Sequence, residues 1–392
     1  IIDGGAVLKN MTVQNGDSWN NGGGIFCAAP DATVRNCVIR NNYSDNIGGG
    51  MFGGRAVNSR FFSNEAMYDG GALHSTDAIG CVIAHNEAGY GAVYGGELRN
   101  CTVVANHAEN GAGGIIDGAL FNTIVWHNTC DNPTGGNDIS SFGLAITHVC
   151  SPDVMHGIDG SITNEPMLAS VSHLVPGSPC IGAGSAAEAQ ETDIDGEAWL
   201  SPPSIGCDEY NAPVLGDIKL SISGITNCAE GVTAEYSFLT IGPVTETQAD
   251  FGDGTVVTNP LAAISKTWNA AGIHDVVLTA WNDSYPGGIS VTQQVNVLSL
   301  AASTIHVALG GDDLNDGSSW ALAKQTIQGG VDEQMVYGGL VLVSNGTYAI
   351  AAEVDVDTAI KVVGFGGPDE TVIDGGGLRR AFYLRHSGCF ID

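Results

Sequence analysis

A short unit recurs six times between residues 8 and 128, and it constrains the fold more than any other feature. Its copies end at residues 16, 42, 64, 86, 106 and 128, so the steps are 26, 22, 22, 20 and 22 residues. A glycine cluster and a short apolar segment separate the copies, as in residues 48–52 (GGGMF). One such unit cannot bury an apolar face alone, but units stacked about 4.8 Å apart can. The repeat therefore predicts a parallel β-solenoid with glycines at its corners.

Aligned copies show which side chains face inward. One column is apolar in every copy, and the column two residues earlier contains small side chains and thiols. The column between them, with Thr12, Arg60 and Thr102, is expected to face water. Cys81 and Cys101 fall in adjacent rows of the earlier column, where free thiols pack like valine, and we expect no disulfide between them. The two inward columns are Val13, Ile39, Phe61, Ile83, Val103 and Val125, and Met11, Cys37, Ser59, Cys81, Cys101 and Thr123.

An asparagine ends five of the six copies. Stacked amides can bond to one another and to turn backbone, and we favour this structural ladder over a ligand-binding ridge. Histidines flank the column in non-adjacent rows, too far apart for one metal ion, so we interpret His85, His107 and His127 as surface or corner residues. The ladder residues are Asn42, Asn64, Asn86, Asn106 and Asn128.

The G-G-(G/A)-I-x-C and N-C-x-(I/V/F)-x-x-N units resemble those of right-handed parallel β-helix proteins, including bacterial polymorphic outer-membrane and surface proteins. The resemblance covers about residues 1–165 and implies the fold, while it says little about activity. No paired acidic and basic columns occur in residues 1–212, so no catalytic site is predicted there.

Residues 166–212 change in style and contain P-G-S-P-C-I-G-A-G and I-G-C-D-E-Y. They resemble the choice-of-anchor segment that follows β-helices in large bacterial surface proteins, and we expect them to cover the open edge of the last coil. The resemblance makes Cys180 and Cys207 the disulfide candidates, since both lie in the closing motif. Turn hydrogen bonding is favoured over calcium binding for four acids, Asp193, Asp195, Asp208 and Glu209.

Residues 213–300 contain D-F-G-D-G-T from Asp250 and a K-T-W-N-A-A-G stretch around Trp268. They resemble the PKD domain, an immunoglobulin-like β-sandwich that acts as a spacer or adhesive unit. Ala249 stands where the family has Trp, and Trp268 where it has Tyr. The resemblance implies a hairpin turn for Asp250 and Asp253 rather than a pair of catalytic carboxylates.

Residues 301–392 resemble the N-terminal cap and first coils of pectate-lyase-like right-handed β-helices, through G-D-D-L-N-D-G-S-S-W-A, T-I-Q and T-V-I-D-G. An Asx-rich turn is favoured over calcium binding for its acidic loop, and calcium is the one cofactor that we consider. Lyases of this superfamily use a basic residue beside acid-bound calcium, and the densest basic cluster here comprises Arg379, Arg380 and Arg385. The candidate calcium ligands are Asp312, Asp313, Asn315 and Asp316.

Charge limits the partners. The chain has 43 acidic and 13 basic residues, a net charge of −30, which disfavours nucleic acid, anionic membranes and acidic sugar polymers. No apolar run is long enough to span a membrane. Few lysines, abundant glycine and this acidity are typical of extracellular proteins, so we expect a bacterial cell-surface or secreted location.

The order of the segments is coils (1–165), closing segment (166–212), sandwich (213–300), then cap and first coils (301–392). This order predicts one period of a tandem or self-assembling fibre, a structural and adhesive surface protein whose copies meet end to end. The alternative is a carbohydrate-active β-helix enzyme or a glycan-binding module that contacts cell-surface glycans. The residues expected at the seam between copies are Met11, Val13, Phe382 and Leu384.

Overall fold

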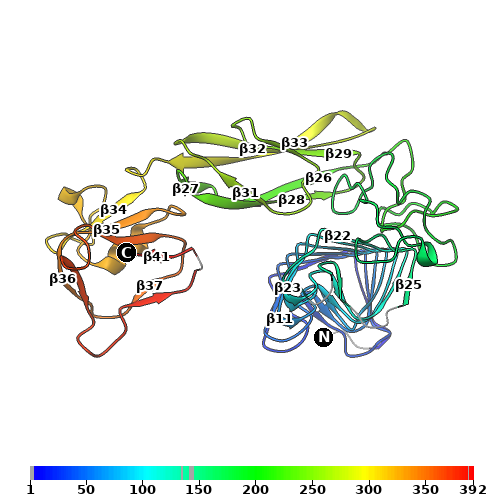
Figure 1. Cartoon of the computed structure of the whole chain (residues 1–392), viewed down its shortest axis with the longest axis horizontal. Coiled ribbons are helices and arrows are strands. Elements are labelled where there is room, and N and C mark those ends of the chain that lie inside the picture. The colour runs from blue at the N-terminus through cyan, green and yellow to red at the C-terminus, as the bar shows by residue number, and fades with distance from the viewer. Residues whose placement is uncertain (1–3, 134–135, 141–144, 387) are drawn as a thin grey trace.

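The computed structural model describes residues 4–133, 136–140, 145–386 and 388–392. The described chain is nearly all β, and most of its strands form a parallel β-solenoid (Figure 1). A single α-helix, α1 (Ile327–Glu333), and two 3₁₀ turns, η1 (Ile158–Gly160) and η2 (Trp320–Leu322), complete the regular structure of these residues. Within them, no helix is long and apolar enough to cross a membrane.

Four parallel sheets run the length of the first solenoid, and each turn of the chain adds one strand to each sheet. The first sheet contains β1 (Val7–Lys9), β5 (Thr33–Arg35), β9 (Arg55–Val57), β13 (Asp77–Ile79), β17 (Glu97–Arg99), β21 (Ala119–Phe121) and β25 (Ala145–Thr147). The second contains β2 (Thr12–Gln14), β6 (Val38–Arg40), β10 (Arg60–Phe62), β14 (Val82–Ala84), β18 (Thr102–Val104) and β22 (Ile124–Trp126). The third contains β3 (Asp17–Ser18), β7 (Tyr43–Ser44), β11 (Glu65–Asp69), β15 (Glu87–Tyr90), β19 (His107–Gly111) and β23 (Thr129–Pro133). The fourth contains β4 (Ile25–Phe26), β8 (Met51–Phe52), β12 (Leu73–His74), β16 (Val93–Tyr94), β20 (Ile115–Ile116) and β24 (Ile139–Ser140).

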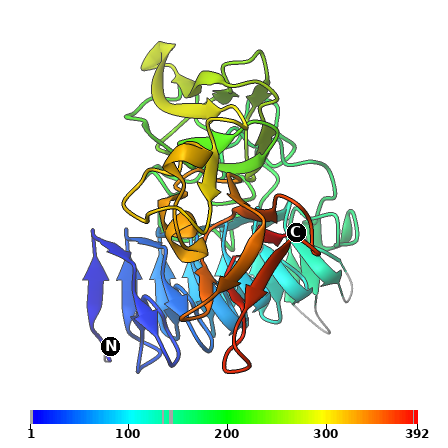
Figure 2. The ribbon, with the colours of Figure 1, turned by 90° about the vertical axis from the view of Figure 1, so that its left-hand side faces the viewer.

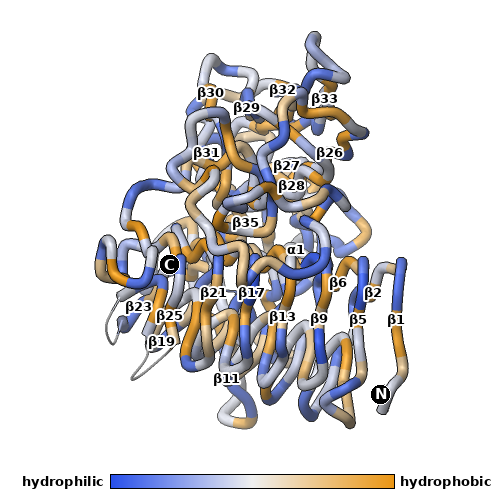
Figure 3. Tube along the Cα trace, turned by 90° about the vertical axis from the view of Figure 1, so that its right-hand side faces the viewer, coloured by the Kyte–Doolittle hydropathy of each residue, from blue (hydrophilic) through white to orange (hydrophobic). Residues whose placement is uncertain are grey.

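Parallel pairing keeps the repeat in register, so equivalent residues stack. Phe61 pairs with Ile39 on one side and with Ile83 on the other, as the aligned columns predict. These side chains belong to one continuous buried core that fills the solenoid. Figure 3 shows the strands of the first sheet side by side in a row from β1 to β21.

Glycine at the corners is required by close backbone contact. A Cβ on Gly49 would lie 2.1 Å from the carbonyl oxygen of Glu65 in the next turn, so no other residue fits there without a backbone shift. Asparagines take the left-handed conformation at other corners, among them Asn36 (φ 51°) and Asn58 (φ 44°).

The segment after the solenoid lies along its side, which differs from the expected cap over the last coil. Leu168, Leu174 and Ile205 share a buried core with outward-facing residues of the second sheet, such as Phe62. The column expected to face water is therefore covered in part: Thr102 is fully buried and Arg60 is partly buried, whereas Thr12 is exposed. The end of the solenoid is instead continued by Cys150, which bridges in parallel onto Ile124, and by Ile162, which bridges in parallel onto Cys150.

Residues 219–298 form two antiparallel sheets, which we call the antiparallel unit. One sheet contains β26 (Lys219–Gly224), β28 (Thr233–Ile241) and β31 (Ile264–Thr267). The other contains β27 (Asn227–Ala229), β33 (Tyr285–Leu298), β32 (Gly272–Asn282), β29 (Glu246–Asp250) and β30 (Val256–Thr258); within it β27 runs parallel to β33. Tyr236 and Phe238 of the first sheet pack against Phe251 and Leu278 in one core.

A second parallel stack, residues 304–391, follows the antiparallel unit. Figure 1 shows it set apart from the first solenoid, with the antiparallel unit reaching from one to the other, and in Figure 2, seen from its own side, it lies in front of that solenoid. Its sheets contain β34 (Thr304–Val307), β35 (Leu340–Val343), β38 (Lys361–Gly364) and β41 (Phe390–Ile391); β36 (Gly346–Ala349) and β39 (Thr371–Asp374); and β37 (Val354–Val356) and β40 (Phe382–Leu384).

Candidate functional site where the closing segment meets the solenoid

The asparagine column forms a continuous hydrogen-bonded ladder inside the solenoid. The Asn64 Nδ2 donates to Asn86 Oδ1 at 3.0 Å, and the Asn86 Nδ2 donates to Asn106 Oδ1 at the same distance. Each carbonyl also accepts the backbone N–H of the asparagine one row earlier, as Asn86 Oδ1 does from Asn64 at 3.0 Å. Asn42 and Asn128 extend the ladder in both directions, and all five side chains are buried. The geometry is a structural ladder and leaves no amide free for a ligand.

The ladder ends on an aspartate that the sequence did not single out. Asn128 Nδ2 donates to Asp138 Oδ1 at 2.7 Å, and the Asn128 N–H donates to the same oxygen at 2.9 Å. Asp153 Oδ2 accepts the N–H groups of Asp138 and Ile139, so a second carboxylate lies close by. Burial raises the pKa of Asp138 to about 6, against the lowering effect of the Asn128 hydrogen bonds.

Arginines on the solenoid bind acids of the closing segment. Arg60 of β10 contacts Asp195 at 3.2 Å, and both side chains are about 15% exposed. Arg35 contacts Glu191 at 3.1 Å, and Arg99 contacts Glu188. Arg35 and Arg99 end strands of the first sheet and Arg60 begins a strand of the second, so these ion pairs hold the closing segment along the border between the two sheets.

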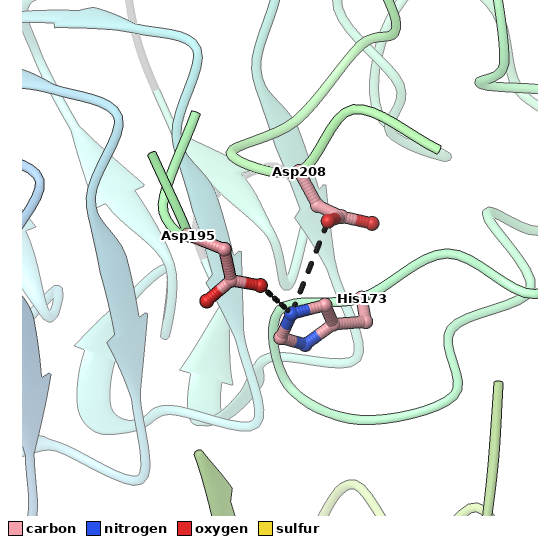
Figure 4. A group of neighbouring side chains, drawn as sticks. All are labelled: His173, Asp195 and Asp208. Carbon is pink, nitrogen blue, oxygen red and sulfur yellow. Dashed lines mark hydrogen bonds and ion pairs between the residues drawn. The ribbon is translucent and has the colours of Figure 1, made fainter. Parts of the chain in front are cut away.

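One of these contacts belongs to a buried cluster, which we call the His173 cluster. His173 Nε2 lies 2.5 Å from Asp195 Oδ2 and 3.9 Å from Asp208 Oδ1. In Figure 4 the two carboxylates lie on the side of the ring that carries Nε2, which points between them. The three ligand atoms all lie within 4.8 Å of one another, and this is the one group of three or more His, Cys, Asp or Glu among the described residues that meets this criterion.

The charges of the cluster explain its protonation. Burial alone lowers the pKa of His173, but Asp195 and Asp208 outweigh it and raise this pKa to about 9. Burial raises the pKa of Asp195, while His173 and Arg60 together hold it below its ordinary value. Burial raises the pKa of Asp208 to about 6. The cluster is thus an imidazolium and a guanidinium facing two carboxylates.

The other two acids of the closing segment organise turns. Asp193 Oδ1 accepts the N–H groups of Asp195 and Glu197, and burial raises its pKa to about 7. Glu209 accepts the Ser204 N–H at 2.9 Å and the Ser204 hydroxyl at 2.6 Å. The sequence grouped these two with Asp195 and Asp208, whereas the structure divides the four between turns and the His173 cluster. His173 itself was missed, because nothing in its local sequence marks it as a partner of distant acids.

The disulfide prediction for Cys180 and Cys207 was wrong. All ten cysteines lie within the described residues and all are free thiols. Because the closing segment runs along the solenoid, these two cysteines meet different partners. Cys180 lies beside Cys150, and this contact together with burial raises the pKa of Cys150, whereas Cys207 donates towards the Ser172 carbonyl at 3.6 Å.

Cys81 and Cys101 stack in adjacent rows without a bond, and the Cys81 N–H donates to Cys101 Sγ at 3.5 Å. Similar bonds join Cys37 to Ser59 and Cys101 to Thr123, so this column is a second internal ladder.

The acidic loop of the second parallel stack shows turn bonding. Asp312 Oδ1 accepts the Leu314 N–H at 3.0 Å, and Asp316 Oδ1 accepts the Ser318 N–H at 2.9 Å. Asp313 accepts three bonds from Gln325 and Thr326, and Asn315 donates to the Ala323 carbonyl. Among the described residues, its three aspartates do not form a convergent group. Calcium binding here remains a prediction.

Other charged candidates are paired locally. Asp250 and Asp253 border the turn between β29 and β30, and Asp253 contacts the buried Lys266 at 2.6 Å, a partner that the sequence did not suggest. Arg380 pairs with Glu353, and Arg385 pairs with Asp355 at 2.5 Å, all on the surface of the second stack.

The corner histidines differ from one another. His127 contacts Glu165 at 2.9 Å and is partly exposed, as expected of a surface residue. His85 is partly buried, and desolvation of its ring lowers its pKa to about 4; its Nε2 is buried and has no hydrogen-bond partner among the described residues. Ser221 and Leu239 of the antiparallel unit line the same hollow as His85, so this corner lies at a contact between the two parts.

A cavity with a volume of about 520 Å³ lies in the second stack. It is lined mainly by apolar atoms from residues 325–328 and 347–354, around the start of α1, and contains none of the residues proposed from the sequence.

The seam residues lie at sheet edges. Met11 is 48% exposed and Leu384 44% exposed, while Val13 and Phe382 pack partly against their own cores. The strands β2 and β40 are terminal in their sheets and do not pair with each other.

The chain matches no protein-family model and no curated protein. What the structure shows is the fold class, an all-β protein built on a parallel β-solenoid.

Proposed function

We propose that this chain is a structural, non-catalytic module of an extracellular or cell-surface assembly, in which stiff units hold solenoids at fixed spacing. The observation that carries the proposal is that hydrogen bonds and packed side chains cross both borders of the antiparallel unit. Flexible linkers with few contacts are the usual arrangement between independent domains.

The first border joins the closing segment to the antiparallel unit. The Thr247 hydroxyl donates to the Ala169 carbonyl at 2.7 Å, and Thr247 is 2% exposed. Ala169 also packs with Ile218, Val244 and Ala280 in a small buried core that spans the border. Because the closing segment is itself bound to the solenoid, these contacts transmit the orientation of the solenoid to the antiparallel unit.

The second border joins the antiparallel unit to the second parallel stack. Cys228 of β27 forms a parallel bridge with Tyr337. The Ala229 N–H donates to the Tyr337 carbonyl at 3.0 Å, and the Tyr337 N–H donates to the Asn227 carbonyl at 3.3 Å. A short ladder of this kind resists hinge bending, because rotation at the border breaks every bond in it.

The antiparallel unit fits the spacer role that its sequence resemblance implies. We infer that it is a PKD-like sandwich, because its two sheets enclose one core and D-F-G-D-G lies at the turn between β29 and β30. The proposal includes end-to-end contact between copies through the edges at β2 and β40, where Met11 and Leu384 expose apolar surface.

A polymer-turnover assay tests the non-catalytic part. The purified chain is incubated with pectate, alginate and neutral polysaccharides, with and without calcium, and new chain ends are measured. We expect no turnover. Turnover that disappears when Arg380→Ala or Arg385→Ala removes a surface base would overturn the proposal in favour of a lyase.

A further inference from the structure

We propose that the His173 cluster is a binding site for a divalent transition metal of the zinc class, with His173, Asp195 and Asp208 as ligands. The proposal concerns the closing segment alone and is independent of the structural role proposed for the whole chain. One imidazole nitrogen and two carboxylate oxygens are ligand types that Zn²⁺ accepts, and calcium is disfavoured because it takes six to eight oxygens.

The ligand separations suit a small movement of one ring. In a tetrahedral zinc site with bonds near 2.0–2.1 Å, neighbouring ligand atoms lie roughly 3.3 Å apart. His173 Nε2 lies 2.5 Å from Asp195 Oδ2 and 3.9 Å from Asp208 Oδ1. These two separations lie on either side of that value, so binding requires the ring to move away from Asp195 and towards Asp208.

Each ligand is held by its other polar atom, as the outer shell of a metal site requires. His173 Nδ1 lies 2.8 Å from the Ser172 hydroxyl. Asp195 Oδ1 contacts Arg60 at 3.2 Å, and Asp208 Oδ2 accepts the Leu174 N–H at 2.9 Å. The three converging atoms face one another, and an ion would replace the proton that His173 Nε2 shares with Asp195 Oδ2. This proton passes to solvent, so binding should weaken as the pH falls. The guanidinium of Arg60 lowers the affinity for a cation, so moderate rather than extreme affinity is expected.

Space for a fourth ligand lies next to the cluster. A crevice lined by His173, Asp195 and Asp208, and on its far side by Pro243 and Val244, has about 10 Å³ of free volume. This is close to the space that one water molecule needs. A site with three protein ligands and one water is thus compatible with the packing between the closing segment and the antiparallel unit.

The test uses the full chain, produced without a histidine tag and freed of metal with a chelator. Zn²⁺ is titrated by calorimetry, and Co²⁺ by visible absorption, which reports tetrahedral coordination. We expect one ion per chain and at least about tenfold weaker binding for Asp208→Asn, which keeps the size of the side chain. The control His127→Gln removes the partly exposed histidine paired with Glu165 and should leave binding unchanged.

If Asp208→Asn does not fold, the double variant Ser170→Ala/Ser172→Ala provides the second test, since it removes both hydroxyls that contact His173 Nδ1, at 3.1 and 2.8 Å, and should weaken binding by about 10–100-fold. No saturable binding of either ion to the folded wild-type chain would overturn the proposal. Equal affinity in wild type and the folded variants would overturn it as well, because the ion would then bind elsewhere.

Discussion

Replacing Asn86 by alanine should destabilise the first solenoid more than any exposed asparagine does. Asn86 is 1% exposed, and its side chain makes five hydrogen bonds in the middle of the ladder. Its carbonyl accepts two bonds from Asn64, and its amide donates to the carbonyls of Phe61, Ala84 and Asn106. The substitution removes one side chain but leaves hydrogen-bonding groups of Asn64 in the preceding row without a partner, and the Asn106 carbonyl in the following row loses the Asn86 amide as a donor.

The magnitude follows from the donors left behind. The Asn64 N–H and one bond of the Asn64 amide lose their acceptor, and an unsatisfied buried donor costs about 1–3 kcal/mol, so we expect a loss of about 2–6 kcal/mol. Urea unfolding followed by circular dichroism measures it as a shift of the midpoint at constant slope. The control Asn132→Ala removes an exposed side chain that donates to the Glu109 carbonyl at 3.2 Å, and should cost less than about 0.5 kcal/mol.

A third variant separates acceptor from donor function. Asn86→Asp keeps the acceptor for Asn64 but loses the amide donor, and at neutral pH it sets a carboxylate against the Asn106 carbonyl oxygen. It should therefore be less stable at pH 7 than at pH 4. The ladder account fails if Asn86→Ala and Asn132→Ala have equal effects.

The remaining predictions concern protonation, the two borders and the thiols. The raised pKa of Asp138 means that this group binds more proton in the folded than in the unfolded state between about pH 4 and 6, so its contribution to stability should fall by up to about 3 kcal/mol as pH rises through this window. Urea unfolding at several pH values should show a smaller fall for Asp138→Asn than for the wild type, with the contributions of Asp193 and Asp208 remaining. Thr247→Val deletes the bond across the first border and should cost about 1 kcal/mol and speed amide exchange there; an unchanged exchange rate would contradict this. Gly338→Ala places a Cβ 2.4 Å from the Val232 side chain of the antiparallel unit, at a backbone φ of 74° that alanine adopts only under strain. Proteolysis at the second border should therefore be faster in this variant, and equal cleavage rates in variant and wild type would argue against a tight border. Of the ten thiols, Cys130 and Cys389 are the partly exposed ones, so a thiol reagent followed by mass spectrometry should label them first in the folded chain.

Much of the first solenoid could be predicted, because strands stacked in register place equivalent side chains in the same environment in every turn. Phe61 pairs with Ile39 and Ile83 because the three residues hold the same position in successive copies of the repeat. The end of the ladder could not be predicted, since Asp138 lies outside the repeat and follows Asn128 by only ten residues rather than about 22.

The site was harder to predict because its partners are distant in sequence. Arg60 was expected to face water, but the closing segment covers its sheet and brings Asp195 to it from 135 residues away. The same lateral course, instead of a cap over the last coil, explains why Cys180 meets Cys150 rather than Cys207. Local motifs predicted turn bonding for all four acids, and Asp193 and Glu209 do organise turns, but the motifs did not show that Asp195 and Asp208 face His173.

The central claim is that the two parallel parts are held at a fixed distance through the antiparallel unit. Spin labels at the exposed positions Glu109 and Asp357 report this distance by pulsed electron paramagnetic resonance. The labels are attached to a non-natural amino acid, because the chain has ten cysteines that would react with a thiol-directed label. The account predicts one narrow distance distribution that Gly338→Ala broadens. A broad distribution in the wild-type chain would contradict it, because the borders would then act as hinges.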